Sequence, residues 1–210
     1  WKLKDIHNDH KISFSLDGQE VSAHPDESIW EVAKRSGKLI PHLCYSDEKS
    51  YRADGNCRAC MVEIEGERTL AASCIRKPSE GMVVLSASSR AKSAQKLVME
   101  LLVTDQPKEE IAHDKSSHFW KMADLQDVKT SRFPEIEKGK IPLLDDSHIA
   151  MSVNLDACIH CNLCVRACRE VQVNDVIGLS GRGRDSKITF DLDDEMGQST
   201  CVACGECVQA

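Results

Sequence analysis

The sequence predicts an α+β fold built from a small sheet, a helical middle and a cysteine-rich C-terminal module. Three observations support this prediction: alternating apolar and polar residues between positions 11 and 85, an amphipathic pattern over 89–105, and cysteines at intervals of three or four after position 157. Alternation is typical of half-buried strands, and apolar residues three or four apart are typical of a helix. With 210 residues, the chain is long enough for two or three small modules.

The first predicted elements are a hairpin and a helix. The segment KISFSLDGQEVSAH alternates on both sides of Asp17-Gly18, a dipeptide that favours a two-residue β-turn. In the following PDESIWEVAKRSG, Ser28 and Glu31 match a capping box, and Gly37 supplies a helix stop. The sequence therefore predicts a strand pair followed by a short helix.

Later segments predict further strands and helices. A second hairpin is expected in 61–73, a strand in 81–88, and an amphipathic helix over 89–105. Residues 106–150 are polar, contain prolines and lack cysteine, so we expect helical fragments and linker there. Between the last two cysteine groups, 187–192 alternates like a strand.

The composition argues against several classes of protein. The formal net charge is −7, which argues against a nucleic-acid partner and against binding to an anionic membrane surface. No run of 18 apolar residues is present, so membrane insertion is not expected. The first residues do not resemble an export signal, which predicts a cytoplasmic protein. Cytoplasmic thiols are kept reduced, so we expect the 11 cysteines to bind metal rather than to form disulfides.

The most specific motif lies in CIHCNLCVRAC, where four cysteines follow the spacing C-x2-C-x2-C-x3-C. This spacing is typical of bacterial ferredoxins, in which three close cysteines bind one [4Fe–4S] cluster and the fourth binds a neighbouring cluster. We expect that fourth cysteine at the start of a helix. A second run, CVACGEC, repeats the three-residue interval. One [4Fe–4S] cluster is therefore predicted to be bound by Cys168, Cys201, Cys204 and Cys207.

The other predicted [4Fe–4S] cluster has three ligands within the sequence, Cys158, Cys161 and Cys164. Reciprocal pairing requires the second run to supply the fourth ligand, and the spacing places that ligand directly after Ala210. We therefore expect the sequence to be a fragment of a longer chain. Zinc fits these two groups poorly, because zinc sites use C-x2-C pairs separated by a dozen or more residues.

An earlier group consists of Cys44, Cys57, Cys60 and Cys74, spaced C-x12-C-x2-C-x13-C. Four cysteines with a central C-x2-C are typical of a [2Fe–2S] site, as in plant-type ferredoxins, although the first gap is longer here. The glycine-bearing loop DGNCRAC would let backbone N–H groups approach the cluster sulfurs. Zinc is an alternative for this group, and a zinc-stapled interaction module is the competing hypothesis for the chain.

The order of these cysteine groups resembles an architecture shared by the large peripheral subunit of NADH:quinone oxidoreductase, iron-only hydrogenases and NAD-dependent formate dehydrogenases. The segments YRADGNCRACMVEIEGER, VNLDACIHCNLCVRACREVQVNDVIG and STCVACGECVQA resemble most closely the N-terminal region of the catalytic (alpha) subunit of molybdenum- or tungsten-containing formate dehydrogenase. The resemblance implies a ferredoxin-like (β-grasp) [2Fe–2S] domain over 1–87, a helical linker over 88–150, and a bacterial-ferredoxin-like domain with two [4Fe–4S] clusters over 151–210, truncated at its C-terminal end.

The resemblance also implies an intramolecular electron relay, with no catalytic centre among these residues. In the parent complex, the remainder of the catalytic subunit would hold a molybdenum or tungsten bis-pterin group and oxidise formate to CO2. A subunit that binds FMN and NAD would receive the electrons. The alternative is an electron-transfer segment of an NADH:quinone oxidoreductase or hydrogenase subunit.

One segment departs from this wider architecture. Many members carry a His-Pro-x2-Cys segment after the helix, which binds a further [4Fe–4S] cluster through one histidine and three cysteines. Here Gln106 stands at the histidine position and no cysteine occurs between residues 75 and 157, so that cluster is not expected. His113 and His118 are interpreted as solvated linker residues rather than replacement ligands.

Overall fold

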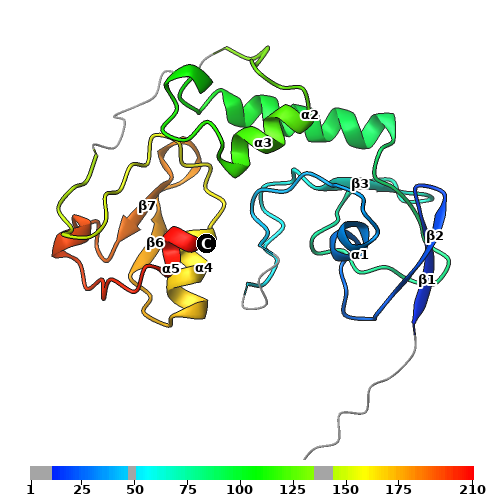
Figure 1. Cartoon of the computed structure of the whole chain (residues 1–210), viewed down its shortest axis with the longest axis horizontal. Helices are drawn as coiled ribbons and strands as arrows, with labels where there is room; N and C mark the ends of the chain where they lie inside the picture. Colours follow the sequence, from blue (N-terminus) through cyan, green and yellow to red (C-terminus); the bar gives the residue numbers. More distant parts are fainter. Residues whose placement is uncertain (1–10, 47–50, 135–143) are drawn as a thin grey trace, which may run out of the picture. The chain divides into compact units, whose positions relative to one another are not determined.

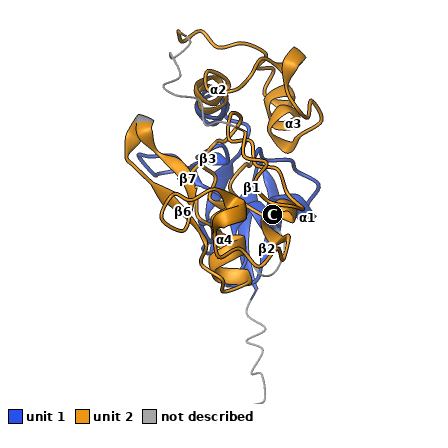
Figure 2. Ribbon diagram, turned by 90° about the vertical axis from the view of Figure 1, so that its left-hand side faces the viewer, with its two compact units in different colours: residues 1–41, 58–95 blue, residues 42–57, 96–210 orange. Residues whose placement is uncertain are grey.

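A computed structural model of the chain describes residues 11–46, 51–134 and 144–210. The chain divides into two compact units, Trp1–Pro41 with Arg58–Gln95 and His42–Cys57 with Lys96–Ala210, which Figure 2 colours separately. Helices and strands both occur, which confirms the predicted α+β class. No helix among the described residues is long and apolar enough to cross a membrane.

The first unit contains a five-stranded sheet with the order β2-β1-β5-β3-β4. β1 and β5 are parallel, and the other neighbouring strands are antiparallel. The two hairpins form between adjacent segments, whereas the β1–β5 pair joins segments far apart in the sequence. The strands are β1 (Ile12–Leu16), β2 (Gln19–Ala23), β3 (Met61–Ile64), β4 (Ala71–Ala72) and β5 (Val83–Leu85).

The turn between β1 and β2 has the geometry that the sequence predicts. Asp17 and Gly18 both have positive φ angles, 50° and 78°. A type I′ hairpin turn requires two such residues between its strands. The carboxylate of Asp17 also accepts hydrogen bonds from the backbone N–H and the hydroxyl of Ser86, each at 2.7 Å, which ties the turn to the end of β5.

Helix α1 (Ile29–Arg35) lies beside the sheet of the first unit (Figure 1). The predicted capping box is present: the Ser28 hydroxyl accepts from the N–H of Glu31 at 3.2 Å, and the Glu31 carboxylate accepts from the N–H of Ser28 at 2.7 Å. Trp30 is buried in the core, where its indole N–H donates to the carbonyl oxygen of Ile40 at 3.1 Å. Gly37, with φ 73°, follows the helix as the sequence predicts.

Helix α2 (Ser89–Val103) confirms the predicted amphipathic helix, and it begins in the first unit and ends in the second. The helical fragments expected after it are the 3-10 turn η1 (Glu109–Ile111) and helix α3 (His118–Leu125). Ser117 caps α3, because its hydroxyl accepts from the N–H of Trp120 at 3.4 Å. The part of the expected linker at 135–143 lies outside the described residues.

The C-terminal part of the second unit is built from short elements. The predicted strand near 187–192 is β7 (Lys187–Phe190), and it pairs with β6 (Ile177–Ser180), which the sequence pattern does not predict. The other elements are α4 (Leu163–Arg166), the π-helical turn η2 (Ala167–Val171), the 3-10 turns η3 (Gly183–Asp185) and η4 (Met196–Gln198), and α5 (Glu206–Gln209). A small apolar cluster holds them together, consisting of Val165, Cys168, Val176, Ile177, Ile188, Phe190 and Met196.

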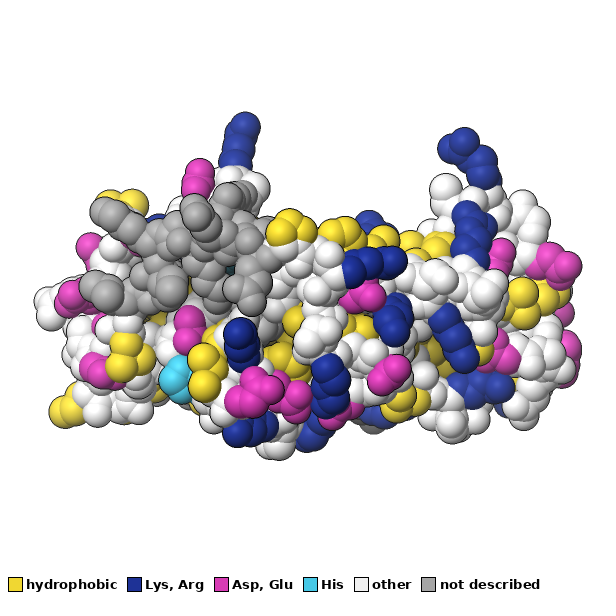
Figure 3. Space-filling model, turned by 90° about the horizontal axis from the view of Figure 1, so that it is seen from above, with side chains coloured by type: hydrophobic (Ala, Val, Ile, Leu, Met, Phe, Trp, Pro, Cys, Tyr) yellow, Lys and Arg dark blue, Asp and Glu magenta, His cyan; other side chains and the backbone are white. Residues whose placement is uncertain are grey.

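Charged side chains of both signs cover the surface. On the face shown in Figure 3, the described Lys and Arg side chains are interspersed with those of Asp and Glu. The chain as a whole carries an excess of acidic residues, 34 against 27 basic ones.

Candidate iron–sulfur sites

All 11 cysteines lie among the described residues. Cys44, Cys60 and Cys74 are buried, as is Cys168, while Cys204 is exposed and the others are half-buried. Cysteine sulfurs gathered in groups of three and four are the donor set that soft metals and iron–sulfur clusters prefer.

The loop that carries Cys158, Cys161 and Cys164 is bent by two residues in the left-handed backbone region. His160 has a φ angle of 51° and Asn162 one of 61°. With this backbone the N–H of His160 lies 3.5 Å from Sγ of Cys158. Backbone N–H groups that donate to thiolate sulfur stabilise bound iron–sulfur clusters and tune their potentials.

The C-terminal cysteine run repeats this backbone geometry. Ala203 (φ 56°) and Gly205 (φ 77°) are left-handed, at the same offsets from the cysteines as the two left-handed residues of the first loop. The N–H of Ala203 lies 3.4 Å from Sγ of Cys201, as in the first loop. A short helix follows each loop, α4 and α5, and its second residue is the third cysteine of the run. The sequence echo between the two runs is therefore a structural repeat.

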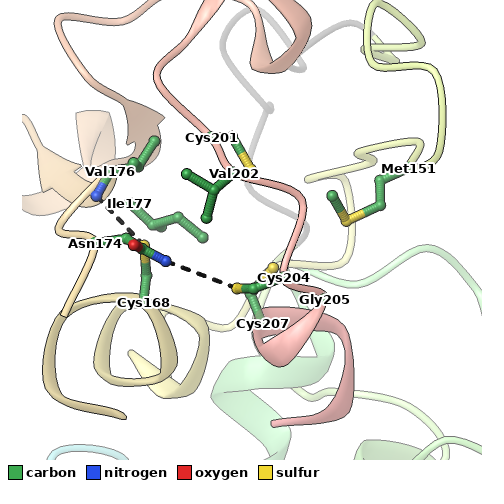
Figure 4. A pocket seen from close by; sticks show the side chains of 10 residues that line it. All are labelled: Met151, Cys168, Asn174, Val176, Ile177, Cys201, Val202, Cys204, Gly205 and Cys207. Carbon is green, nitrogen blue, oxygen red and sulfur yellow. Dashed lines mark hydrogen bonds between the residues drawn. The ribbon is translucent and has the colours of Figure 1, made fainter. Parts of the chain in front are cut away.

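Four predicted ligands line a single cavity of the second unit (Figure 4): Cys168, Cys201, Cys204 and Cys207. The remaining lining is mostly apolar and consists of Met151, Val176, Ile177 and Val202 together with Gly205 and Asn174. The fold thus brings together the four thiols that the sequence assigns to one [4Fe–4S] cluster.

Hydrogen-bond donors reach the sulfurs of this cavity. The backbone N–H of Val176 lies 3.3 Å from Sγ of Cys168, and Nδ2 of Asn174 lies 3.9 Å from Sγ of Cys204 (Figure 4). Thiolates, nearby N–H donors and an apolar lining are the surroundings that an iron–sulfur cluster requires. The residues present therefore fit such a cluster.

Cys168 lies inside a continuous helical segment, so the expectation that it begins a helix is wrong. Helix α4 continues directly into η2, and Cys168 is the second residue of that π-helical turn. In an α-helix, residues four apart share a face, so Cys164 and Cys168 would point in similar directions. Cys168 nevertheless lines the cavity that it shares with Cys207.

The thiols of the first loop lie in a low-dielectric environment. Burial raises the pKa of Cys164 to about 12, and the negative fields of Cys161 and Cys158 add to the increase. Burial also raises the pKa of Cys158 and that of Cys161. These three thiols therefore hold their protons at neutral pH, and a metal group must displace the protons when it binds.

The earlier cysteine group is distributed over both units. Cys44 and Cys57 belong to the second unit, and Cys60 and Cys74 belong to the first. Within the first unit, Ser73 joins the two cysteine segments, because its N–H and its hydroxyl donate to the carbonyl oxygen of Cys60 at 3.1 and 2.8 Å. The [2Fe–2S] ligand set stays a prediction.

A site for a single metal ion places different demands on its ligands. Within 11–46, 51–134 and 144–210, no three His, Cys, Asp or Glu side chains converge closely enough to hold one ion. An iron–sulfur cluster spreads its thiolates over several iron atoms, so its ligands lie farther apart than those of one zinc ion.

Two family profiles match the sequence. A 2Fe-2S iron-sulfur cluster binding domain matches residues 9–89, and a 4Fe-4S dicluster domain matches residues 157–210. The first match contains the cysteine group that begins at Cys44, and the second contains all seven later cysteines. The [2Fe–2S] and dicluster domains expected from the sequence are therefore confirmed, although the exact domain bounds stay a prediction.

Relatives contain both domains in one chain. The NADP-reducing hydrogenase subunit HndD of Solidesulfovibrio fructosivorans is 29% identical over 94% of this chain and 34% of its own. An NADH-quinone oxidoreductase subunit of Rickettsia typhi is 30% identical over 87% of this chain and 27% of its own. The mitochondrial NADH-ubiquinone oxidoreductase 78 kDa subunit of Candida albicans is 31% identical over 85% of this chain and 25% of its own. This chain thus spans a quarter to a third of their length.

A solved structure has the same fold. A chain of an NAD+-reducing [NiFe]-hydrogenase in the H2-reduced state matches with a TM-score of 0.79 and 25% identity, over 91% of this chain and 80% of that one. The protein carries a 2Fe–2S domain and a 4Fe–4S dicluster domain, and over both of them it is similar to NADH-quinone oxidoreductase and NAD(P)-reducing hydrogenase subunits.

The similarity to these subunits changes the weight of the two interpretations from sequence. The relatives named above are hydrogenase and NADH-quinone oxidoreductase subunits, so they support the alternative interpretation better than the formate dehydrogenase one. Electron transfer through iron–sulfur clusters is common to both interpretations.

Gln106, which the sequence comparison with the wider architecture aligns with a histidine ligand, contacts the segment before the first cysteine loop. Its Nε2 donates to the carbonyl oxygen of Ala157 at 3.2 Å. His113 is exposed, and its Nε2 lies 3.5 Å from Oδ2 of Asp156. His118 is exposed too, and its Nε2 lies 2.6 Å from a backbone carbonyl oxygen of the second unit. Gln106 and His113 thus attach the linker to the domain that follows it, whereas His118 contacts His42, which precedes the linker.

Arg166, which lies between two predicted ligands in the segment CVRAC, is a site residue that the cysteine pattern does not reveal. Its side chain is 3% exposed, and its Nη2 donates to the carbonyl oxygen of Cys44 at 2.5 Å and to that of Cys161 at 3.3 Å. A basic residue flanked by two cysteine ligands could have been noticed as a candidate. The burial of Arg166 and its contact with Cys44 could not have been predicted from the sequence, since both depend on tertiary structure.

Proposed function

We propose that this chain is an electron-relay segment of a multi-subunit oxidoreductase of the NADH-quinone oxidoreductase or NAD(P)-reducing hydrogenase type. The observation that carries the proposal is the convergence of Cys168, Cys201, Cys204 and Cys207 on one cavity within the residues that match a dicluster family. When bound, iron–sulfur clusters accept and donate one electron at a time. The chain itself supplies thiolates, an apolar lining and donors to sulfur.

The proposed ligands fall into three sets. The [2Fe–2S] set consists of Cys44, Cys57, Cys60 and Cys74, and one [4Fe–4S] set consists of Cys168, Cys201, Cys204 and Cys207. The second [4Fe–4S] set contains Cys158, Cys161 and Cys164, with a fourth ligand supplied from outside the present sequence. The repeated left-handed loops support a pair of equivalent [4Fe–4S] sites, since both loops shape their first thiols in the same way.

The reaction itself is proposed to take place elsewhere in a complex. The sequence contains no Walker loop and no G-x-G-x-x-G motif, so the nicotinamide nucleotide named in the relatives' titles needs another binding surface. We therefore propose a flavin- and NAD-binding partner subunit as one electron carrier and the remainder of the parent chain as the other. A cytoplasmic location is proposed too, because such sites need reduced thiols.

The test is anaerobic isolation followed by iron, sulfide and EPR analysis. We expect acid-labile sulfide, about ten iron atoms per chain if all three clusters are complete, and separate EPR signals of [2Fe–2S] and [4Fe–4S] groups after reduction with dithionite. A colourless protein that contains zinc and no sulfide would refute the proposal and support the zinc-stapled module.

A second candidate function is formate oxidation coupled to NAD reduction, with a molybdenum or tungsten bis-pterin group and FMN elsewhere in the complex. The observation that favours it is Gln106 at the histidine position together with the lack of cysteine between 75 and 157. The native complex separates the candidates. Formate-dependent NAD reduction with bound molybdenum or tungsten would support the second candidate, whereas NADH- or hydrogen-dependent activity without those metals would support the first.

A further inference from the structure

Arg166 joins backbone segments of the second unit that are far apart in the sequence. Its Nη2 donates to the carbonyl oxygens of Cys44 and Cys161, at 2.5 and 3.3 Å. Its Nη1 donates to the carbonyl oxygen of Arg52, and its Nε donates to that of Asn162 at 3.3 Å. One side chain therefore holds the segment around Cys44 against the loop of the first [4Fe–4S] set.

The guanidinium is buried, and the carboxylates of the described part of the chain offset its charge only in part. Its donors are satisfied mainly by neutral carbonyl oxygens, and Oδ2 of Asp54 lies 3.9 Å from its Nε. Asp54 is shared with Arg52, whose Nη1 lies 2.7 Å from Oδ1 of the same carboxylate. A buried charge is unfavourable unless it is compensated, so the site calls for further negative charge nearby. Iron–sulfur clusters bound by four thiolates would supply this additional negative charge, because the net charge of such a cluster with its ligands is negative.

We propose that Arg166 is a positioning residue for electron transfer between the [2Fe–2S] site at Cys44 and the [4Fe–4S] site at Cys161. The inference rests on the proposed function, since it requires both groups. It assigns two roles to one side chain: the hydrogen bonds to both ligand carbonyls fix the spacing of the sites, and the permanent positive charge favours their reduced states.

The physical reason lies in the charge of the transferred electron. In the step itself one site loses one electron, the other gains it, no bond is made or broken, and Arg166 is unchanged. A site becomes more negative when it is reduced, so a fixed neighbouring cation raises its reduction potential. Arginine is suited to this role because it stays protonated and its planar fork can donate to two acceptors at once.

The test compares the holo protein with the variants Arg166→Gln and Arg166→Lys by EPR-monitored redox titration. Gln removes the charge, and we expect the reduction equilibrium of the [2Fe–2S] signal to weaken about ten-fold, which corresponds to a midpoint about 59 mV lower for one electron. The [2Fe–2S] EPR signal of this variant should also relax more slowly than in the wild type. The reduced [4Fe–4S] cluster speeds this relaxation, and its effect weakens as the distance between the two clusters grows. Lys keeps the charge without the fork, so it should retain most of the potential and lose part of the relaxation enhancement.

Two further variants make the test specific. Arg182→Gln makes the same substitution at an exposed arginine between β6 and β7, and it should leave both readouts at wild-type values. Asp54→Asn removes the carboxylate beside Arg166 and should raise the midpoint. If Arg166→Gln fails to bind clusters, Arg166→Lys and Asp54→Asn test the role of Arg166 in its place, since both variants keep a cation at position 166.

The outcomes separate the inference from the proposed function. Equal midpoints and equal relaxation in Arg166→Gln and Arg182→Gln, both with full iron content, would overturn the role of Arg166 and leave the electron relay intact. A midpoint of the [2Fe–2S] signal that is unchanged or lowered in Asp54→Asn would also count against the proposed role of Arg166. Failure of the proposed function has a different signature, a wild-type protein without iron, sulfide or a reducible EPR signal.

Discussion

The hydroxyl of Tyr51 donates a 2.9 Å hydrogen bond to Oε1 of Glu206, the first residue of α5. The other carboxylate oxygen of Glu206 accepts from Nε2 of Gln172 at 3.2 Å. All three residues belong to the second unit, and Glu206 directly precedes Cys207. These side chains therefore anchor the short helix that carries the last predicted ligand.

Replacement of Tyr51 by Phe should lower the stability of the folded chain. The part-buried Glu206 contact would lose its donor, which costs about 1 kcal/mol and corresponds to a decrease in Tm of about 2–4 °C for a chain of this size. Thermal unfolding of the holo protein at neutral pH measures the effect. Gln172→Ala is a matched control, because it removes the other, more exposed donor to the same carboxylate and should cost less.

The effect of Tyr51→Phe should also depend on pH. Burial raises the pKa of Tyr51 from 10.0 to about 12, and the hydrogen bond to Glu206 adds to the increase. Since the folded-state pKa is the higher one, the contribution of Tyr51 is fully present below about pH 10 and is lost as pH rises toward 12. The difference in Tm between wild type and Tyr51→Phe should therefore shrink over this range. A constant difference would contradict the assignment.

The left-handed turn at Gly205 predicts a backbone effect on the C-terminal loop. Gly205 has a φ angle of 77°, and a Cβ built on it meets no atom within 4 Å. The cost of Gly205→Ala is therefore conformational, about 1 kcal/mol, and appears as a lower Tm and faster iron loss. Gly178→Ala is the matched control, since that glycine has no positive φ and its Cβ would lie 3.8 Å from Oγ1 of Thr189. Equal losses in both variants would show that the left-handed turn is not the cause.

Local features of the fold could be predicted because the necessary information lies within a few residues. The turn at Asp17 and Gly18 and the capping box at Ser28 each depend on side chains and backbone angles of one short segment. The cysteine runs are local in the same sense, because their spacing sets how thiols are presented. For this reason the grouping of Cys168 with Cys207 in one cavity agrees with the prediction.

Other features could not be predicted because they depend on contacts between distant segments. The parallel pairing of β1 with β5 and the strand β6 are set by packing rather than by local alternation. The π turn after α4 has no signature in the letters CVRACREV, and it places Cys168 differently from the expected start of a helix. Arg166 lies between two cysteines in the sequence, but only the tertiary fold shows its burial and its contact with Cys44.

Removal of the clusters should unfold the C-terminal part of the chain and spare part of α2. Only seven buried residues form the apolar cluster around the loops of residues 150–210, so the metal groups are expected to supply much of its stability. Helix α2 (Ser89–Val103) contains the buried residues Ala91, Met99 and Glu100, so it has packing of its own. Chelation under reductant should therefore reduce the circular dichroism signal. Hydrogen exchange should show lost protection in β6 and β7 and retained protection in α2; unchanged spectra would reject this expectation.

Serine substitutions should assign the two proposed [4Fe–4S] sites separately. Cys168→Ser and Cys158→Ser keep the size of the side chain but replace a thiolate ligand, and each should remove about four iron atoms from a different site. The [2Fe–2S] EPR signal should persist in both, whereas Cys60→Ser should remove it with about two iron atoms.

The donor contacts predict which [4Fe–4S] signal each variant affects. Val176 donates to Cys168 and Asn174 donates to Cys204, so Asn174→Ala should perturb the signal that is lost in Cys168→Ser and leave unchanged the signal that is lost in Cys158→Ser. EPR spectra of the reduced single variants and the double variants test this pairing. Wild-type iron content in Cys168→Ser, or loss of the same signal in both serine variants, would mean that the division of the seven C-terminal cysteines between two sites is wrong.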